Sequence, residues 1–253
     1  MKLELPTQED FSIPKINKRV IWFYGKPFSG KSTLASKAPQ PLFLNTDGNA
    51  QYLGVPYVKV EDVVEKRGRL TETTKAWEVY KGYLDLLAGG NEQYKTIVID
   101  LLNDTYEMAR LFMYDKLGIT HESDDSFRAW DKVRIEFLSN IRKTAALPYE
   151  NIILISHEDD TKDFTSKSGE KFTSIKPKMQ DKVADSIAGM CAFVGRCYVE
   201  NGEHLLSISP SDVVFGGGRL NTGNITIKQD WKEIEKLFDT YNDRWYNNTC
   251  SKR

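Results

Sequence analysis

The sequence predicts a three-layer α/β fold, in which a mainly parallel sheet is covered by helices on both faces and extended by antiparallel strands near the C-terminus. Three observations predict it. Apolar runs of strand length recur up to residue 156, segments with helical periodicity lie between them, and shorter β-like runs follow a polar stretch. Buried strands that alternate with helices favour a parallel sheet, because parallel strands need long crossover connections.

Four apolar runs are expected to form the parallel part of the sheet. Each is short, rich in β-branched or aromatic residues and almost continuously hydrophobic, which is typical of a strand buried on both faces. The four runs are RVIWFYG at 19–25, PLFLNTD at 41–47, KTIVID at 95–100 and NIILIS at 151–156.

Two segments between these strands have apolar residues at helical spacing. We expect their aromatic side chains to anchor the core rather than to contact a cofactor. The first segment carries Trp77, Tyr80, Leu84 and Leu87, and the second carries Trp130, Phe137, Leu138 and Ile141.

The end of the chain contains three shorter β-like runs, at 192–199, 204–210 and 224–230. We expect them to form hairpins that extend the same sheet. Asp230 is then expected to cap a last helix. The apolar face of that helix carries Trp231, Ile234, Leu237, Phe238 and Tyr241.

No stretch of the sequence resembles an interdomain linker, so we expect one domain over residues 1–253. A short lead-in at 1–18 and a frayed tail at 243–253 would flank it.

The composition predicts a soluble cytoplasmic protein. The formal net charge of −1 creates no global field for polyanions, so any contact with nucleic acid must come from a local patch. The cysteines lack metal-ligand spacing and are expected to be reduced thiols. No segment approaches the ~20 apolar residues of a membrane span, and we expect no membrane partner.

A phosphate-binding motif follows the first apolar run. The pattern GxxxxGK[ST] is complete from Gly25 to Ser32, and it lies after a predicted buried strand and before a predicted helix. Glycines let successive backbone N–H groups point at one spot. Lys31 has the reach for the β- and γ-phosphates, and the Ser32 hydroxyl suits Mg²⁺. The expected ligands are therefore ATP and Mg²⁺, with the nucleotide held by Gly25, Lys26, Pro27, Phe28, Ser29, Gly30, Lys31, Ser32 and Thr33.

Three polar residues at the ends of later apolar runs complete the expected site. Asp100 ends the third run, which is the usual Walker B position for a carboxylate that holds Mg²⁺. Asp47 follows the second run and is a candidate for orienting an attacking water. His157 follows the fourth run, at the end of the sheet where ligands bind in open α/β folds. Two other interpretations fit the same residues: Asp47 as a turn residue beside Gly48, and His157 as a core histidine bonded to backbone.

Five motifs together resemble those of RecA-like P-loop ATPases. They are YGKPFSGKS, FLNTDGN, IVID, LISHE and IKPKMQDKVAD. The chain is most similar to short phage-encoded members, nucleotide-binding or AAA-type proteins related to the Sak-group single-strand annealing recombinases. The resemblance extends from about Ile13 to Phe238 and implies a RecA-like sheet, a homo-oligomer and, for a phage protein, the host cytoplasm. It also implies a catalytic set, in which His157 senses the γ-phosphate and Arg219 reaches a neighbouring subunit's nucleotide; the set is Lys31, Asp47, His157 and Arg219.

The chain departs from this family at two positions. Asp47 stands where RecA-like enzymes carry a catalytic glutamate, and the acidic stretch at 120–127 stands near the place of a first DNA loop. The stretch Thr161–Lys182 takes the place of the mobile DNA-binding loop. It has six lysines against three acidic residues, so we expect it to contact single-stranded DNA. A solvated hairpin has nearly the same composition.

These features predict a Mg²⁺-dependent ATP hydrolase that binds single-stranded DNA and acts in phage-type recombination or strand annealing. A single-strand-binding protein is a further candidate partner. Two other functions fit the same site: a nucleotide-gated interaction protein such as a helicase loader, and a small-molecule or nucleotide kinase. A kinase needs an acceptor pocket and an arginine-rich lid, and the nearest candidate, EKRGRL at 65–70, is short.

Overall fold

The computed structural model describes residues 16–121, 124, 128–165, 171–209, 211, 213–220 and 225–250. The strands are β1 (Arg19–Gly25), β2 (Pro41–Asn45), β3 (Tyr57–Lys59), β4 (Val63–Arg67), β5 (Leu70–Thr74), β6 (Thr96–Asp100), β7 (Asn151–Thr165), β8 (Lys171–Pro177), β9 (Phe193–Glu200), β10 (Glu203–Ser207), β11 (Gly217–Gly218) and β12 (Thr226–Lys228). The helices are α1 (Lys31–Ser36), the 3₁₀ helix η2 (Asn49–Tyr52), α2 (Ala76–Ala88), α3 (Leu102–Leu117), α4 (Arg128–Ala146), α5 (Asp181–Ala188) and α6 (Trp231–Cys250).

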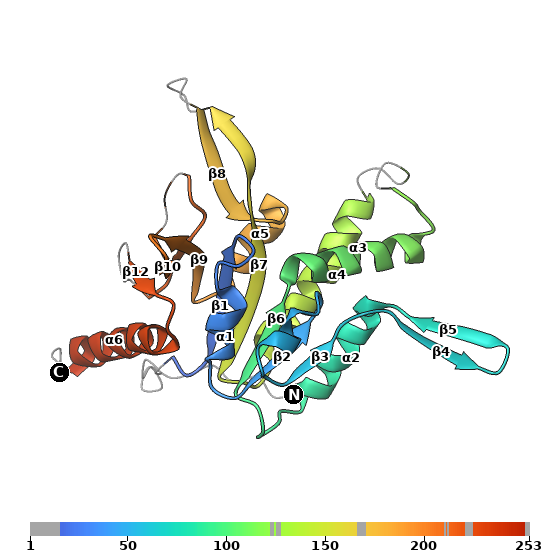
Figure 1. The fold of residues 1–253 in the computed structure, drawn as a ribbon, viewed down its shortest axis with the longest axis horizontal. Helices are drawn as coiled ribbons and strands as arrows, with labels where there is room; N and C mark the ends of the chain where they lie inside the picture. Colours follow the sequence, from blue (N-terminus) through green and yellow to red (C-terminus); the bar gives the residue numbers. More distant parts are fainter. Residues whose placement is uncertain are drawn as a thin grey trace.

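A ten-stranded sheet forms the middle layer (Figure 1). Its order is β12-β10-β9-β1-β7-β6-β2-β3, with β8 paired to β7 and β11 paired to β9. The four expected strands β1, β2, β6 and β7 lie side by side and run parallel, β2 next to β6, β6 next to β7, and β7 next to β1. Because they are parallel, their carboxyl ends meet at one edge of the sheet.

Two apolar clusters cover the two faces of the sheet. Trp22 and Tyr24 of β1 pack with residues of α2, α3, α4 and α5, whereas Ile21 and Phe23 pack with residues of α1 and α6. This alternation follows from the two-residue period of a strand, which sends neighbouring side chains to opposite faces. The arrangement confirms the predicted three-layer α/β fold with antiparallel strands added near the C-terminus.

The expected core anchors are buried with one exception. All four anchors of α2 are buried, as are Phe137, Leu138 and Ile141 of α4. The expectation is wrong for Trp130, which is 37% exposed. Trp130 lies in the first turn of α4 and lines a cavity with Tyr106 and Lys178, so its ring borders solvent instead of the sheet.

The C-terminal strands differ from the expectation in one respect. β10 and β12 extend the sheet with antiparallel pairing, as predicted, but β9 pairs parallel with β1 and so joins the parallel part. Helix α5 precedes β9 and makes the crossover that parallel pairing needs. Asp230 caps α6 as predicted, because its carboxylate accepts the N–H of Lys232 at 3.1 Å.

Helix α6 continues to Cys250, past the residue where fraying was expected. Its span contains no glycine or proline that would stop it. The first part of the expected lead-in, residues 1–15, lies outside the described residues.

Strand β7 is longer than predicted. The sequence predicts its end at Ser156, but the strand continues to Thr165 and pairs antiparallel with β8, so that a hairpin projects from the sheet (Figure 1). Pairing with β8 satisfies the backbone groups of β7 beyond the sheet. The stretch that resembles a DNA-binding loop is therefore largely a β7–β8 hairpin.

A second projection was not predicted. Strands β4 and β5 form a separate two-stranded sheet between β3 and α2, and Figure 1 shows this arm extending away from the central layers. The stretch that the sequence offered as a short kinase lid, at 65–70, forms the end of the arm.

Candidate nucleotide-binding site

The loop between β1 and α1 has the geometry that the motif predicts. At Gly25 the backbone approaches β9 so closely that a Cβ atom would lie 2.1 Å from the Cys197 carbonyl oxygen. Gly30 has a φ of 90°, which glycine adopts readily and other residues do not. Both glycines of the motif are thus required by the backbone.

The Lys31 side chain is folded into this loop. It is 5% exposed, and its Nζ donates hydrogen bonds to the carbonyl oxygens of Gly25 at 2.9 Å and Lys26 at 2.7 Å. Burial lowers the pKa of the lysine. The Lys31 ammonium group is therefore held at the loop, where it can exchange its hydrogen bonds to backbone carbonyls for hydrogen bonds to phosphate oxygens.

Ser32 and Asp100 meet as a Mg²⁺ site requires. The Ser32 Oγ donates to Asp100 Oδ2 at 2.7 Å, across the carboxyl ends of β1 and β6. The Asp100 side chain is fully buried, and its Oδ1 has no hydrogen-bond partner among the described residues. Burial raises the pKa of Asp100 to about 7, against the opposing effect of the Ser32 hydrogen bond. A buried carboxylate oxygen without a donor suits a cation.

The described residues contain no cluster of three or more histidine, cysteine, aspartate or glutamate side chains that could hold a metal.

Asp47 lies beside the site and also closes a turn. Its Oδ1 accepts hydrogen bonds from Asn45 Nδ2 at 2.9 Å and from the Asn49 N–H at 3.0 Å, and Gly48 has a φ of 78°. The side chain is exposed, and its negative charge contributes to the raised pKa of Asp100. The geometry thus shows the turn interpretation, and a role for Asp47 in orienting water stays a prediction.

His157 lies directly beside the start of the loop. It is opposite Gly25 in the parallel pairing of β1 with β7. The backbone N–H of His157 donates to Asn103 Oδ1 at 3.0 Å, and its backbone carbonyl accepts the Lys178 N–H at 2.8 Å. Burial, followed by the charge of Lys31, lowers the pKa of the imidazole. A neutral ring at physiological pH follows from both effects.

The sequence analysis missed a polar network from the first turn of α3. Thr46 Oγ1 donates to Asp104 Oδ2 at 3.1 Å and accepts the Leu101 N–H at 2.8 Å, while Asn103 holds the His157 backbone. The signal was present in IVIDLLND, since polar residues three and four positions after a Walker B aspartate stay near the strand end when a helix starts at once.

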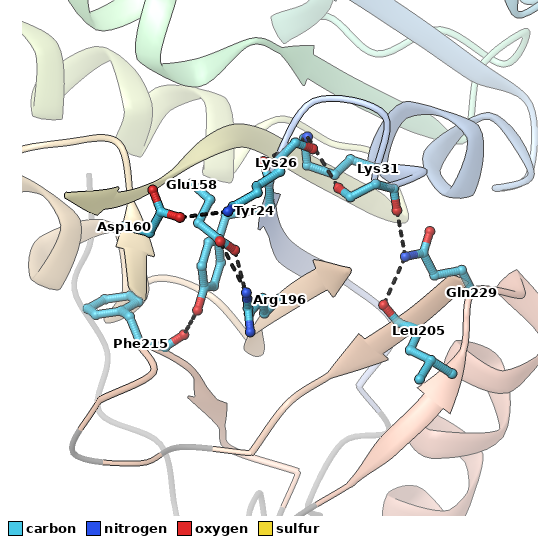
Figure 2. Close-up of polar contacts among 11 residues, drawn as sticks. Tyr24, Lys26, Lys31, Glu158, Asp160, Arg196, Leu205, Phe215 and Gln229 are labelled. Carbon is cyan, nitrogen blue, oxygen red and sulfur yellow. Dashed lines mark hydrogen bonds and ion pairs between the residues drawn. The ribbon is translucent and has the colours of Figure 1, made fainter. Parts of the chain in front are cut away.

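A second network connects the loop to β7 and β9 (Figure 2). The Glu158 side chain is 1% exposed and forms a bidentate ion pair with Arg196, with Nε to Oε2 at 2.7 Å and Nη2 to Oε1 at 3.1 Å. Lys26, expected to contact nucleotide, forms an ion pair with Asp160 at 2.6 Å. The Tyr24 hydroxyl donates to the Phe215 carbonyl. No sequence pattern predicted these pairs.

Arg219 is remote from the loop in its own chain. The backbone N–H of Arg219 donates to the Ala192 carbonyl. The backbone N–H of Ala192 in turn donates to the carbonyl of Val20, at the start of β1. The Arg219 guanidinium donates to the Gly189 carbonyl at the end of α5. Arg219 therefore lies near the amino end of β1, while Gly25 lies at the carboxyl end. A role for Arg219 across a subunit boundary stays a prediction.

The lysines of the expected DNA-binding stretch are placed in part. Lys176 forms an ion pair with Asp181 at 3.4 Å, and Lys178 lines a cavity of about 430 Å³ that also contains Trp130. The side chains at 162–172, including those of Phe164 and Phe172, lie outside the described residues.

The AAA domain family matches residues 17–220 of the chain. Comparison with curated proteins gives no match. Among the helices that the structure describes, none combines the length and apolarity of a membrane span.

Solved structures give several similarities. The chain is 12% identical to the RadB recombinase, with a TM-score of 0.42 over 82% of this chain and 84% of that one. It is 11% identical to the flagellar accessory protein FlaH from Methanocaldococcus jannaschii, with a TM-score of 0.35 over 83% and 84% of the two chains. A type III secretion ATPase from pathogenic bacteria is 12% identical, with a TM-score of 0.41 over 72% of this chain and 51% of that one.

Proposed function

We propose that this chain, which belongs to the AAA domain family and is a P-loop ATPase of that class, hydrolyses ATP with Mg²⁺ and couples hydrolysis to the binding of single-stranded DNA in recombination or strand annealing. One observation carries the proposal: the hydrogen bond from Ser32 to the buried Asp100, beside a lysine folded into the phosphate loop. These three groups are the parts of a phosphoryl-transfer site that the chain itself must supply.

Each residue has a separate task in this proposal. Lys31 binds the β- and γ-phosphates, and Ser32 with Asp100 holds Mg²⁺, which neutralises charge on the phosphates when bound. Asp47 orients the attacking water. His157 reports the presence of the γ-phosphate, since its backbone is bonded to Asn103 on one side and Lys178 on the other.

The β7–β8 hairpin supports the DNA-binding part of the proposal. Strand β7 is continuous from His157 into the hairpin, so a change at the nucleotide has a short backbone path to it. Lys176, Lys178 and Lys182 lie at or beyond the returning strand β8. With a net charge of −1, DNA binding must depend on such a local group of lysines.

The decisive experiment measures ATP hydrolysis with and without single-stranded DNA, in wild-type protein and in Lys31→Ala. We expect hydrolysis by the wild type, stimulation by single strands over duplex, and almost none with the variant. Wild-type hydrolysis that ignores DNA would overturn the DNA part alone. Transfer of phosphate to a small acceptor would favour a kinase instead.

We also propose one folded domain and a homo-oligomer in which Arg219 acts on a neighbour's nucleotide. An arginine that a neighbouring subunit supplies to the nucleotide site makes hydrolysis depend on assembly of the oligomer. Mixing Arg219→Ala with Lys31→Ala should therefore restore part of the activity, since one interface then pairs an intact loop with an intact arginine. Mixed oligomers without any recovery would exclude Arg219 from the site.

A nucleotide-gated interaction protein is a second candidate, and the β4–β5 arm favours it. The arm is an isolated two-stranded sheet, which is marginal alone in water, and it exposes Val64 at 56% and Leu70 at 75%. In this case ATP would control binding to a protein partner. ATP-dependent pull-down by the wild type, lost in Val64→Ser with Leu70→Ser, would support it, provided that DNA leaves hydrolysis unchanged.

A further inference from the structure

Two side chains from the C-terminal antiparallel strands contact the phosphate-binding loop. Gln229 directly follows β12, and its Nε2 donates to the Ser29 carbonyl at 2.8 Å and to the Leu205 carbonyl at 2.9 Å. His204, on β10, has its Nδ1 3.2 Å from the same Ser29 oxygen. Figure 2 shows Gln229 between the loop and Leu205. The loop is thus held from outside by residues far away in the sequence.

The contact between Gln229 and Ser29 is buried and supported by further hydrogen bonds, whereas His204 is exposed. Ser29 is 4% exposed and Gln229 is 9% exposed. The Gln229 N–H donates to the His204 carbonyl at 3.0 Å, and the Lys37 Nζ donates to the Gln229 carbonyl at 3.4 Å. Because both its side chain and its backbone are bonded, the Gln229 amide has a fixed position against the loop.

The bond to Ser29 determines where the next N–H points. The Ser29–Gly30 peptide is trans, and in a planar trans peptide the C=O and the N–H point to opposite sides. Holding the Ser29 carbonyl toward Gln229 therefore directs the Gly30 N–H away from the C-terminal strands. In a P-loop, backbone N–H groups directed to one spot cradle the phosphates.

Gly30 shows how closely Gln229 and His204 approach. A Cβ atom at Gly30 would lie 2.4 Å from Gln229 Oε1 and 2.8 Å from His204 Nδ1. The second glycine of the motif is therefore needed for its positive φ, and its lack of a Cβ also leaves room for these two side chains. The motif and the C-terminal strands fit each other sterically.

We propose that Gln229, supported by His204, is a positioning residue for nucleotide binding, which holds the Ser29–Gly30 peptide in the orientation that binds phosphate. The inference rests on the proposed function in taking the loop to bind nucleotide. Gln229 lies beyond the segment that matches the AAA domain family, which ends at residue 220. The antiparallel extension of the sheet thus takes part in the nucleotide site.

The test compares binding of fluorescent N-methylanthraniloyl-ADP by wild type, Gln229→Leu and Gln229→Glu, with thermal unfolding measured in parallel. Gln229→Leu removes the buried donor to the Ser29 carbonyl and leaves that oxygen with the longer contact to His204 Nδ1, so the nucleotide Kd should rise by about 5- to 100-fold. Lys228→Met is the matched control: Lys228 is the adjacent residue, its side chain pairs with the exposed Glu203, and nucleotide affinity should be unchanged.

Gln229→Glu separates positioning from general support of the fold. A protonated carboxyl donates a hydrogen bond and a carboxylate does not, and burial raises carboxyl pKa values. The Glu variant should therefore bind nucleotide more tightly at pH 5.5 than at pH 8, and by a larger factor than Gln229→Leu, which controls for the effect of pH on the rest of the protein.

The outcomes are distinct. Wild-type affinity in Gln229→Leu, or a pH response of Gln229→Glu no larger than that of Gln229→Leu, would overturn the inference while the proposed function stands. A lower melting temperature with unchanged affinity of the folded protein would assign Gln229 to stability alone. Absence of nucleotide binding by the wild type would overturn the proposed function and this inference together.

Discussion

Strand β7 passes through two regions of the molecule that are held in different ways. From Asn151 to Ser156 it is buried in the sheet, beside the phosphate loop, and beyond Thr161 it forms one side of the projecting hairpin. Beside the first region each polar contact includes a buried group, as with Asp100, which accepts from Ser32, and the Glu158 side chain, which pairs with Arg196 just after this segment. Among the described side chains of the second region, Lys176 of β8 forms an exposed ion pair with Asp181.

The difference between the two regions predicts which substitutions most affect hydrolysis and stability. A buried polar group that loses its partner keeps its full desolvation cost, whereas an exposed ion pair exchanges its contact for water. The nucleotide end is therefore fixed before a ligand arrives, and the hairpin can adapt to one. Changes at the first should have large effects on hydrolysis or stability, and changes at the second should have small, salt-dependent ones.

The largest effect is expected from Lys31→Ala. Its Nζ is the positive charge held inside the loop, and removal of one preorganised electrostatic group costs about 10²–10³-fold in rate. Steady-state ATP hydrolysis should fall by about 10³-fold, with the folded state retained by circular dichroism. Hydrolysis at the wild-type rate would mean that the loop does not bind the transferred phosphate.

Asp100→Asn should stabilise the metal-free protein at high pH. Burial raises the pKa of Asp100 from 3.8 to about 7, so between those values the folded protein binds a proton that the unfolded chain releases. Stability contributed by this group is present at low pH and lost as pH rises from about 4 to about 7.

Urea unfolding in EDTA should therefore show the Asn variant more stable than the wild type at pH 8, by up to about 4 kcal/mol, with the difference shrinking toward pH 4. The variant should also lose Mg²⁺-dependent hydrolysis. Equal stability at pH 8 would show that the Asp100 carboxylate is not strained by burial.

Arg196→Met tests the buried ion pair. It leaves the Glu158 side chain, which is 1% exposed, without its cation, and breaking a buried pair in this way costs about 3 kcal/mol. Denaturant unfolding should report that loss. The double variant with Glu158→Gln should recover part of it, since no buried charge then remains; additive losses would contradict the account.

Asp47→Asn should slow the chemical step by about 10²-fold, at the low end for a general base, and leave ATP affinity nearly unchanged. The amide keeps the size of the side chain but loses its negative charge. The measurement compares the effects on kcat and on KM. Asn49→Ala is the control for the turn, because it removes the Asn49 Nδ2 donor to Asp47 Oδ2. An unchanged kcat would leave Asp47 with the turn role alone.

The smallest effect is expected on the hairpin. Changing Lys176, Lys178 and Lys182 together to alanine should weaken binding of single-stranded DNA and flatten the slope of log affinity against log salt by up to about two units. Basal hydrolysis should survive, because Lys176 pairs with an exposed residue rather than with the nucleotide site. An unchanged slope would place DNA elsewhere.

The sequence predicted those parts of the site that depend on local pattern. The loop from Gly25 to Ser32 follows from spacing, and Asp100 follows from its place at the end of a buried run. Parallel pairing then brings the strand ends together, so the Ser32–Asp100 contact was predictable although 68 positions separate the two residues.

The tertiary structure alone decided which distant side chains hold that loop and where other residues lie. Ser29 and Gln229 are 200 positions apart, and Arg219 lies at the opposite end of β1 from the loop. The continuation of β7 to Thr165 and the exposure of Trp130 were equally hidden. The physical reason is that periodicity and motif spacing record contacts within one element, whereas these positions depend on how strands pair and which way a side chain faces after pairing.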